Sequence, residues 1–234
     1  MNTQDQTQPL DISYQCLAPA LIITLIAASL FASLFTGCAD DKEPLDLDFD
    51  ILRTEPFSES LSEYGLFIEP ASTLTPASGV HLYELSSELF TDYAGKQRLI
   101  RVPEGASVTV SGGLPTYPEG TLLAKTFYFN ADLNDPTAGR QLVETRLLIK
   151  RGGRWNVATY LWNESQTDAA LSLGGSTVEV SFLDHSGAQR NTAHEVPSEI
   201  ACVTCHQRAD QSVYIGPKLK NLDRDVERDG VIVN

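Results

Sequence analysis

The chain has 234 residues and is strongly acidic, with 31 Asp and Glu residues against 17 Lys and Arg residues and a net charge of −14. Such a surface repels nucleic-acid phosphates and anionic lipids, so the composition argues against a nucleic-acid partner and against electrostatic attachment to a membrane. A chain of this length can bury one full hydrophobic core or two small ones. We therefore expect a globular body, and any tether to a membrane must come from a separate segment.

An apolar segment near the start of the chain predicts such a tether. Residues 17–35 are almost wholly apolar and lead into Thr36, Gly37 and Cys38. The arrangement resembles a bacterial lipoprotein signal, which implies that residues 1–37 are a signal peptide and that Cys38 carries the lipid. No Lys or Arg precedes the run, and its length approaches the roughly twenty residues of a membrane span, so an uncleaved N-terminal anchor is the alternative. Both interpretations place the rest in the bacterial cell envelope, on the periplasmic or cell-surface side.

Residues 38–75 are predicted to be an acidic tether between the anchor and the body. Acidic side chains crowd its first part, and Leu45, Leu47, Phe49 and Ile51 alternate with several of them. A flexible acidic spacer is one interpretation of this stretch. Alternation of this kind is also typical of an edge strand, which is the other interpretation.

The pattern from residue 76 to residue 190 predicts a β-rich domain. Short runs of β-branched and aromatic residues are separated by turn signals, which is typical of an antiparallel sandwich or jelly roll. Gly152 and Gly153 lie between two such runs, and this pair predicts a tight hairpin. The expected strands cover residues 80–85, 98–103, 107–110, 120–129, 142–150, 155–162 and 176–182.

Cys202, Cys205 and His206 form a C-x-x-C-H motif, the attachment signature of c-type haem. Two thiols at this spacing can each form a thioether to a haem vinyl group, and the histidine that follows ligates the iron as the proximal ligand. The motif therefore predicts one covalent haem c. Ser198 is the expected N-cap of a short helix that carries the motif. We expect residues 191–234 to be a partial, α-helical cytochrome c haem-binding segment after the β-rich domain.

Other uses of the two motif cysteines fit the sequence less well. A structural zinc site needs about four nitrogen or sulfur ligands, and the sequence contains no second cysteine pair. A thioredoxin-like redox pair follows a βαβ pattern, whereas a Pro- and Glu-containing linker precedes Cys202. A structural disulfide across two residues is strained. With Cys16 in the signal and Cys38 assigned to lipid, no cysteine remains for another disulfide or a second covalent haem.

A segment after the motif resembles small cytochromes c. Gly216, Pro217 and Leu219 form the G-P-x-L pattern that follows C-x-x-C-H in that family. There, the proline carbonyl accepts a hydrogen bond from the second ring nitrogen of the proximal histidine and so orients the ring. The resemblance therefore implies that Pro217 is the partner of His206.

The sequence provides no obvious ligand for the far side of the iron. Met1 is the sole methionine, so the usual sulfur ligand is missing. His194 precedes His206 by twelve residues, a distance that an extended chain spans easily, and it is the best protein candidate. His81 and His185 are the other choices, and we expect each of the three to be an exposed loop histidine. An open or water-ligated iron is therefore the prediction.

Similarity to a known group of proteins extends over most of residues 80–222. The matching stretches are residues 89–98, 118–121, 125–128, 144–148, 160–164, 166–169, 196–197, 202–206 and 215–218. Together they resemble an uncharacterised group of secreted bacterial dihaem c-type cytochromes with a β-rich region before the haems. The resemblance implies electron transfer with a redox partner protein. Members of the group continue to a second C-x-x-C-H, so we expect either a truncated gene product or a second haem subunit that is encoded separately.

These features predict a membrane-tethered c-type cytochrome that transfers electrons. A haem enzyme or a ligand sensor with an open iron site is the first alternative, because O₂, peroxide or small gases can bind a free position. We can assign no catalytic acid or base above the haem, so electron transfer is preferred over catalysis. The second alternative is a β-domain binding lipoprotein in which the haem motif is a remnant.

Overall fold

The structure is a computed structural model, and it describes residues 57–208, 211–228 and 231–233. The chain divides into two units, Met1–Asp46 and Leu47–Asn234, and every described residue belongs to the second unit. The predicted signal peptide, Cys38 and the first part of the predicted tether lie outside the described residues.

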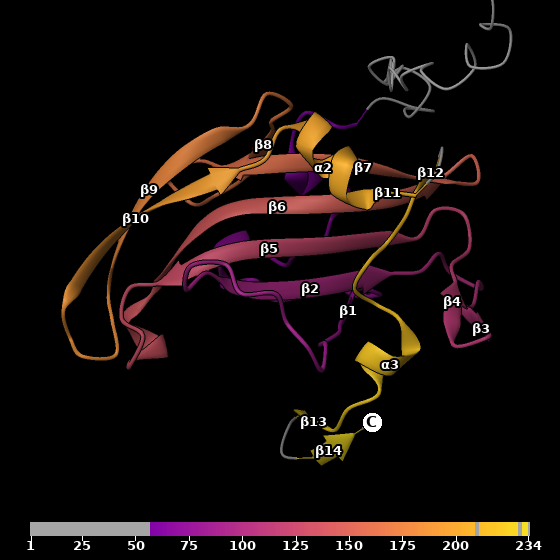
Figure 1. The fold of residues 1–234 in the computed structure, drawn as a ribbon, viewed down its shortest axis with the longest axis horizontal. Coiled ribbons are helices and arrows are strands. Elements are labelled where there is room, and N and C mark those ends of the chain that lie inside the picture. Colours follow the sequence, from indigo (N-terminus) through magenta and orange to yellow (C-terminus); the bar gives the residue numbers. More distant parts are fainter. Residues whose placement is uncertain (1–56, 209–210, 229–230, 234) are drawn as a thin grey trace, which may run out of the picture. The chain divides into compact units, whose positions relative to one another are not determined.

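A six-stranded antiparallel sheet forms the centre of the described unit (Figure 1). Gly152 and Gly153 join the neighbouring strands β6 (Arg140–Arg151) and β7 (Arg154–Trp162), with φ angles of 58° and 76°. Glycine adopts these left-handed angles without strain, and the tightest hairpin turns require them, so the predicted hairpin is confirmed. In spatial order the strands are β1 (His81–Leu82), β2 (Gly95–Arg101), β5 (Leu122–Asn130), β6 (Arg140–Arg151), β7 (Arg154–Trp162) and β8 (Ala169–Leu171).

Shorter elements are attached around this sheet. The hairpin of β9 (Ser176–Leu183) and β10 (Gln189–Val196) leads directly into helix α2 (Glu199–His206). The other strands pair as three small hairpins. These elements are β3 (Thr109–Ser111), β4 (Leu114–Thr116), β11 (Gln207–Arg208), β12 (Gln211–Ser212), β13 (Val226–Arg228), β14 (Val231–Val233), helix α3 (Leu219–Leu222) and the 3-10 helices η1 (Leu61–Tyr64), η2 (Ala71–Thr73) and η3 (Pro136–Ala138).

One face of the sheet is covered by residues that precede β1. Leu61 and Leu66 are almost fully buried, and they belong to one hydrophobic core with Leu147 of β6 and Tyr160 of β7. Residues 57–75 are therefore part of the folded body, and their assignment to the tether is wrong. The reason is that they fold as single 3-10 turns and irregular segments, which leave neither a helical nor a strand period in the sequence.

The opposite face is partly covered by the β9–β10 hairpin. Val180 and Phe182 of β9 pack on Phe127 and Phe129 of β5. The predicted antiparallel β class is thus confirmed, but the covering layer is a hairpin where a sandwich would place a second large sheet. Strand β10 was not expected, because its inward positions are mostly polar and include His194.

Candidate functional site

Helix α2 carries all three motif residues and packs against β7 (Figure 1). The Ser198 hydroxyl accepts a hydrogen bond from the Ala201 amide at 3.3 Å, and its carbonyl accepts one from the Cys202 amide at 3.1 Å. The predicted N-cap is therefore confirmed. Because β10 ends at Val196, two residues before this cap, the hairpin fixes where the helix begins above the sheet.

Both motif cysteines are free thiols, and they lie one helical turn apart. Residues three apart share a face of a helix, so both thiols can reach one planar group. Cys202 is buried, with its Sγ 3.8 Å from the Thr159 Oγ1 of β7, whereas Cys205 is exposed. Burial raises the pKa of the Cys202 thiol, but a catalytic redox pair needs a lowered thiol pKa. This environment argues against a thioredoxin-like function of the pair.

His206 ends the helix, and its imidazole is oriented by the backbone. Its Nδ1 lies 2.9 Å from the Val213 carbonyl oxygen. Because a carbonyl only accepts, Nδ1 carries the hydrogen and Nε2 keeps its lone pair. Burial lowers the pKa of His206, and this favours the neutral imidazole that a metal requires. The same arrangement orients metal-ligating histidines in general.

Pro217, the partner predicted for His206, makes a different contact. Its carbonyl accepts a hydrogen bond from the Tyr117 hydroxyl at 3.1 Å. The prediction named the wrong carbonyl because β11 and β12 form a hairpin directly behind α2. This hairpin returns the chain to the end of the helix at Val213, before the G-P-x-L segment begins.

Aromatic residues attach the segment after the motif to the sheet. The ring of Tyr214 lies 5.0 Å from that of Tyr117 and 5.8 Å from that of Trp155, in edge-to-face contacts. Farther along, the Ser86 amide donates a hydrogen bond to the Asn221 carbonyl at 2.8 Å. These contacts hold the segment against the sheet beside the motif.

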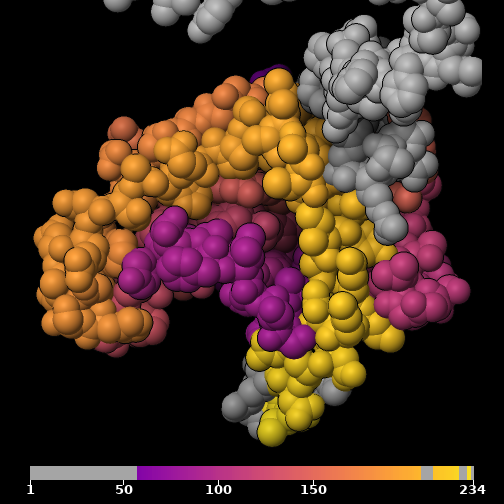
Figure 2. Space-filling view, in the orientation of Figure 1, coloured from indigo at the N-terminus to yellow at the C-terminus, as the bar shows by residue number. Residues whose placement is uncertain are grey.

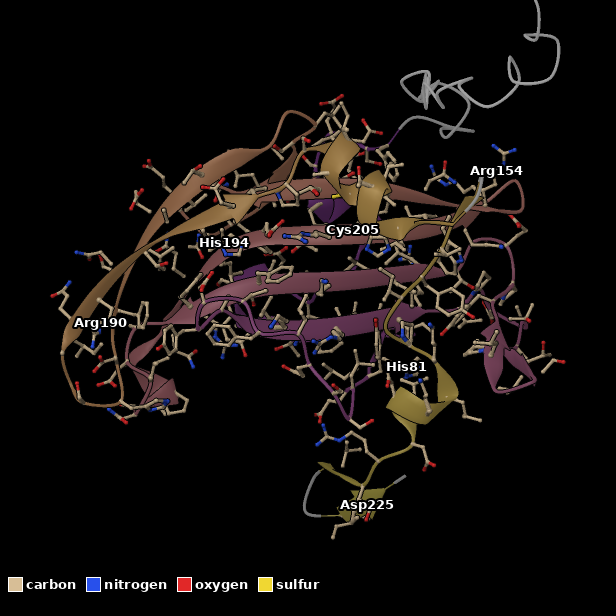
Figure 3. The ribbon with its side chains drawn as sticks, in the orientation of Figure 1. His81, Arg154, Arg190, His194, Cys205 and Asp225 are labelled. Carbon is tan, nitrogen blue, oxygen red and sulfur yellow. The ribbon has the colours of Figure 1, made fainter. Side chains whose placement is uncertain are left out.

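His194 is buried on β10 and faces the sheet, with 8% of its surface exposed (Figure 3). Its Nε2 lies 2.8 Å from Glu144 Oε1, and its ring centroid lies 5.6 Å and 5.8 Å from those of Phe127 and Phe129. An ionised carboxylate only accepts, so Nε2 carries the hydrogen. The expectation of an exposed loop histidine is therefore wrong for His194. The burial of this ring is set by the unexpected strand β10.

The other two histidines are exposed. His185 lies in the turn between β9 and β10, as expected, with its Nδ1 3.2 Å from the Asn134 Oδ1. His81 lies on strand β1 and not in a loop; Figure 3 shows it away from His194 and Cys205. Within the described part of the chain, no group of three or more His, Cys, Asp and Glu residues is arranged to hold a metal ion.

Glu144 is a central buried charge that the sequence analysis did not identify. Its carboxylate is fully buried and accepts hydrogen bonds from Arg146 Nε at 2.8 Å and Nη2 at 2.5 Å, in addition to that from His194. Burial opposes ionisation, but these hydrogen bonds outweigh it and hold the pKa of Glu144 below its usual value. The sequence did contain a signal for this pair. Glu144 and Arg146 are two residues apart on β6, so both point to the same side of the sheet as Leu148.

The space-filling view shows that this face of the sheet is hollowed. In Figure 2 the central strands lie deeper than the orange hairpin and helix, the magenta segment before β2 and the yellow C-terminal segment. The motif helix thus stands at the rim of a depression whose floor is the sheet.

Comparison with known proteins leaves the function to be argued from this geometry. No protein-family model matches the chain, and no curated protein or solved structure is similar to it. Among the described residues, no helix has the length and apolar character that are needed to span a membrane.

Proposed function

We propose that this chain is a membrane-tethered c-type cytochrome that carries one covalent haem and transfers electrons in the bacterial cell envelope. The observation that carries the proposal is the C-x-x-C-H motif on α2, with Cys202 and Cys205 free and His206 Nδ1 bonded to the Val213 carbonyl. Two thiols on one helix face can attach the vinyl groups of a haem c, and a neutral imidazole can ligate its iron. When bound there, the haem supplies one-electron oxidation and reduction at its iron.

Each group of the site then has a separate role. Cys202 and Cys205 would hold a haem through two thioether bonds, and His206 would provide Nε2 to its iron. Val213 keeps the imidazole in one orientation and one tautomer through its carbonyl oxygen. We propose that residues 191–234 are the partial cytochrome c segment, with the motif on α2, and that the β-rich body is the platform on which this segment rests.

The location follows from the sequence of the N-terminal region. We propose that Cys38 carries a lipid after removal of residues 1–37, so that the body lies on the periplasmic or cell-surface side of a membrane. Electrons then pass to or from a redox partner protein, and a separately encoded second haem subunit is the partner that the resemblance implies. The net charge of −14 argues against nucleic acid as a partner.

A haem-based ligand sensor or enzyme is the second candidate, and two observations favour it. Met1 is the sole methionine. Nε2 of His194 is bonded to Glu144, and its ring is enclosed by Phe127 and Phe129. His194 therefore has a structural role, and the far side of the iron is left to water or to a small ligand.

The proposal is tested by optical spectroscopy of the chain co-expressed with a c-type haem-attachment system. We expect haem absorption bands that sharpen with dithionite and return to the starting spectrum with ferricyanide. Cyanide added to the oxidised protein separates the candidates further, because an iron that binds it readily has an open position. A protein without haem bands would contradict the proposal and would favour a β-domain lipoprotein with a remnant motif.

A further inference from the structure

Three cationic side chains form a row across the hollowed face of the sheet. In the strand register, Arg98 of β2 lies opposite Lys125 of β5, and Lys125 lies opposite Arg146 of β6. Directly opposed side chains of an antiparallel pair share one face of the sheet. Like charges in such positions destabilise a sheet, and this row stands in a chain whose net charge is −14. An anion on this face would relieve the repulsion.

The central cation of the row, Lys125, forms no direct ion pair with a described residue, although the Glu144 carboxylate attracts it from a distance. Arg98 pairs with Glu88 at 2.7 Å, and Arg146 pairs with Glu144 at 2.5 Å. No hydrogen bond or ion pair joins the Lys125 ammonium to another described residue; its contact is with the Phe127 ring, 5.0 Å away. Burial, followed by the charges of Arg146 and Arg98, lowers the pKa of Lys125 to about 8. Buried charges are normally paired.

The row leads to the haem motif. Thr159 of β7 lies opposite Arg146, and its hydroxyl oxygen contacts Cys202 Sγ. Adjacent strands are about 4.8 Å apart, so Lys125 lies roughly 10 Å and Arg98 roughly 14 Å from Thr159 across the sheet. This span is comparable to the width of a porphyrin ring. At the far end, Arg98 and Lys96 line an open cavity of about 250 Å³.

We propose that Lys125, flanked by Arg98 and Arg146, binds the propionate carboxylates of a haem that is attached at Cys202 and Cys205. The inference rests on the proposed function, since it concerns the edge of the same haem that lies opposite the two thioether bonds. A haem whose vinyl edge is attached at α2 would extend its carboxylate edge across the floor of the hollow to Lys125, the one cation of the row that forms no ion pair with a described residue. The two negative charges of the propionates would offset the repulsion between the neighbouring cations of the row.

The test uses the full chain with its covalent haem, in a buffer free of carboxylates so that no external carboxylate can replace a propionate. Lys125→Gln is compared with Lys125→Arg, which keeps the charge, and with Lys150→Gln. Lys150 belongs to the same sheet, but its ammonium is bonded to the Gly153 carbonyl at 3.0 Å, at the turn between β6 and β7. All proteins are checked for covalent haem by staining after denaturing electrophoresis, and for folding by circular dichroism.

We expect Lys125→Gln to lower the haem reduction potential, because the lost positive charge no longer disfavours the oxidised iron. The resonance Raman bending band of the propionates should shift in the same variant. Lys125→Arg should restore both values, and Lys150→Gln should leave both unchanged. Stained protein in which Lys125→Gln changes neither the potential nor the band would overturn the propionate site alone. Absence of staining in the parent chain would overturn the haem proposal and this inference together.

Discussion

Replacement of Glu144 by Gln tests whether the buried charge network holds the β9–β10 hairpin on the sheet. The Glu144 side chain has 0% exposure and accepts hydrogen bonds from Arg146 on its own strand and from His194 on β10. Gln keeps the shape but removes the negative charge, which leaves the Arg146 guanidinium without its counter-ion. Removal of one partner from a buried ion pair costs about 3–5 kcal/mol. Because 24% of the Arg146 side chain is exposed, we expect the lower end, about 3 kcal/mol.

The pH dependence of this loss has a definite sign. The pKa of Glu144 is held below its usual value in the folded protein, so its contribution to stability is complete above the unfolded pKa of about 4.3. It is lost as the pH falls through the lower folded pKa, where the wild-type carboxylate becomes protonated. The difference in unfolding free energy between wild type and Glu144→Gln should therefore decrease as the pH falls below about 4.

The assay is urea denaturation of both proteins, supported by thermal melts. For a domain of 150–250 residues, a loss of about 3 kcal/mol lowers Tm by roughly 6–12 °C. Glu84→Gln is the matched control, because Glu84 and Arg224 form an exposed pair at 3.5 Å whose loss should cost less than about 1 kcal/mol. A loss for Glu144→Gln no larger than that of the control, or a loss that does not change down to pH 3, would refute the reasoning.

Three further outcomes follow from the account. The double variant Cys202→Ser/Cys205→Ser should keep a β-type circular dichroism spectrum and a cooperative melt, since the cores of the sheet are built from side chains outside the motif; loss of both would show that haem organises the fold. His194→Ala should destabilise the protein and leave the spectrum of the ferric haem high-spin, whereas a change from a low-spin spectrum would identify His194 as an iron ligand. Cys38→Ala should abolish labelling by a fatty-acid analogue, and label that persists would locate the attachment elsewhere or show an uncleaved anchor.

Local sequence patterns predicted the parts of this fold that depend on neighbours along the chain. The turn at Gly152 and Gly153 needs two residues with left-handed backbone angles, and two consecutive glycines in the sequence predict such a turn. Ser198 caps the helix that follows it within one turn. The motif spacing likewise places Cys202 and Cys205 on one helix face, because helical geometry alone determines it.

The remaining features depend on which distant segments meet, and no local pattern encodes that. His194 is buried because β10 pairs with β9 and faces Glu144, which is fifty residues earlier in the sequence. The row that includes Lys125 exists through the register of three separate strands. The carbonyl of Val213, and not that of Pro217, contacts His206 because a short hairpin of polar residues reverses the chain after the helix.

The central claim is tested most directly by the intact mass of the chain after co-expression with a c-type haem-attachment system. The account predicts a protein heavier by one haem, with the added mass on a proteolytic peptide that contains Cys202 and Cys205, and no added mass in the Cys202→Ser/Cys205→Ser variant. An unmodified mass, with both thiols open to alkylation in the denatured protein, would contradict the assignment of this chain as a c-type cytochrome.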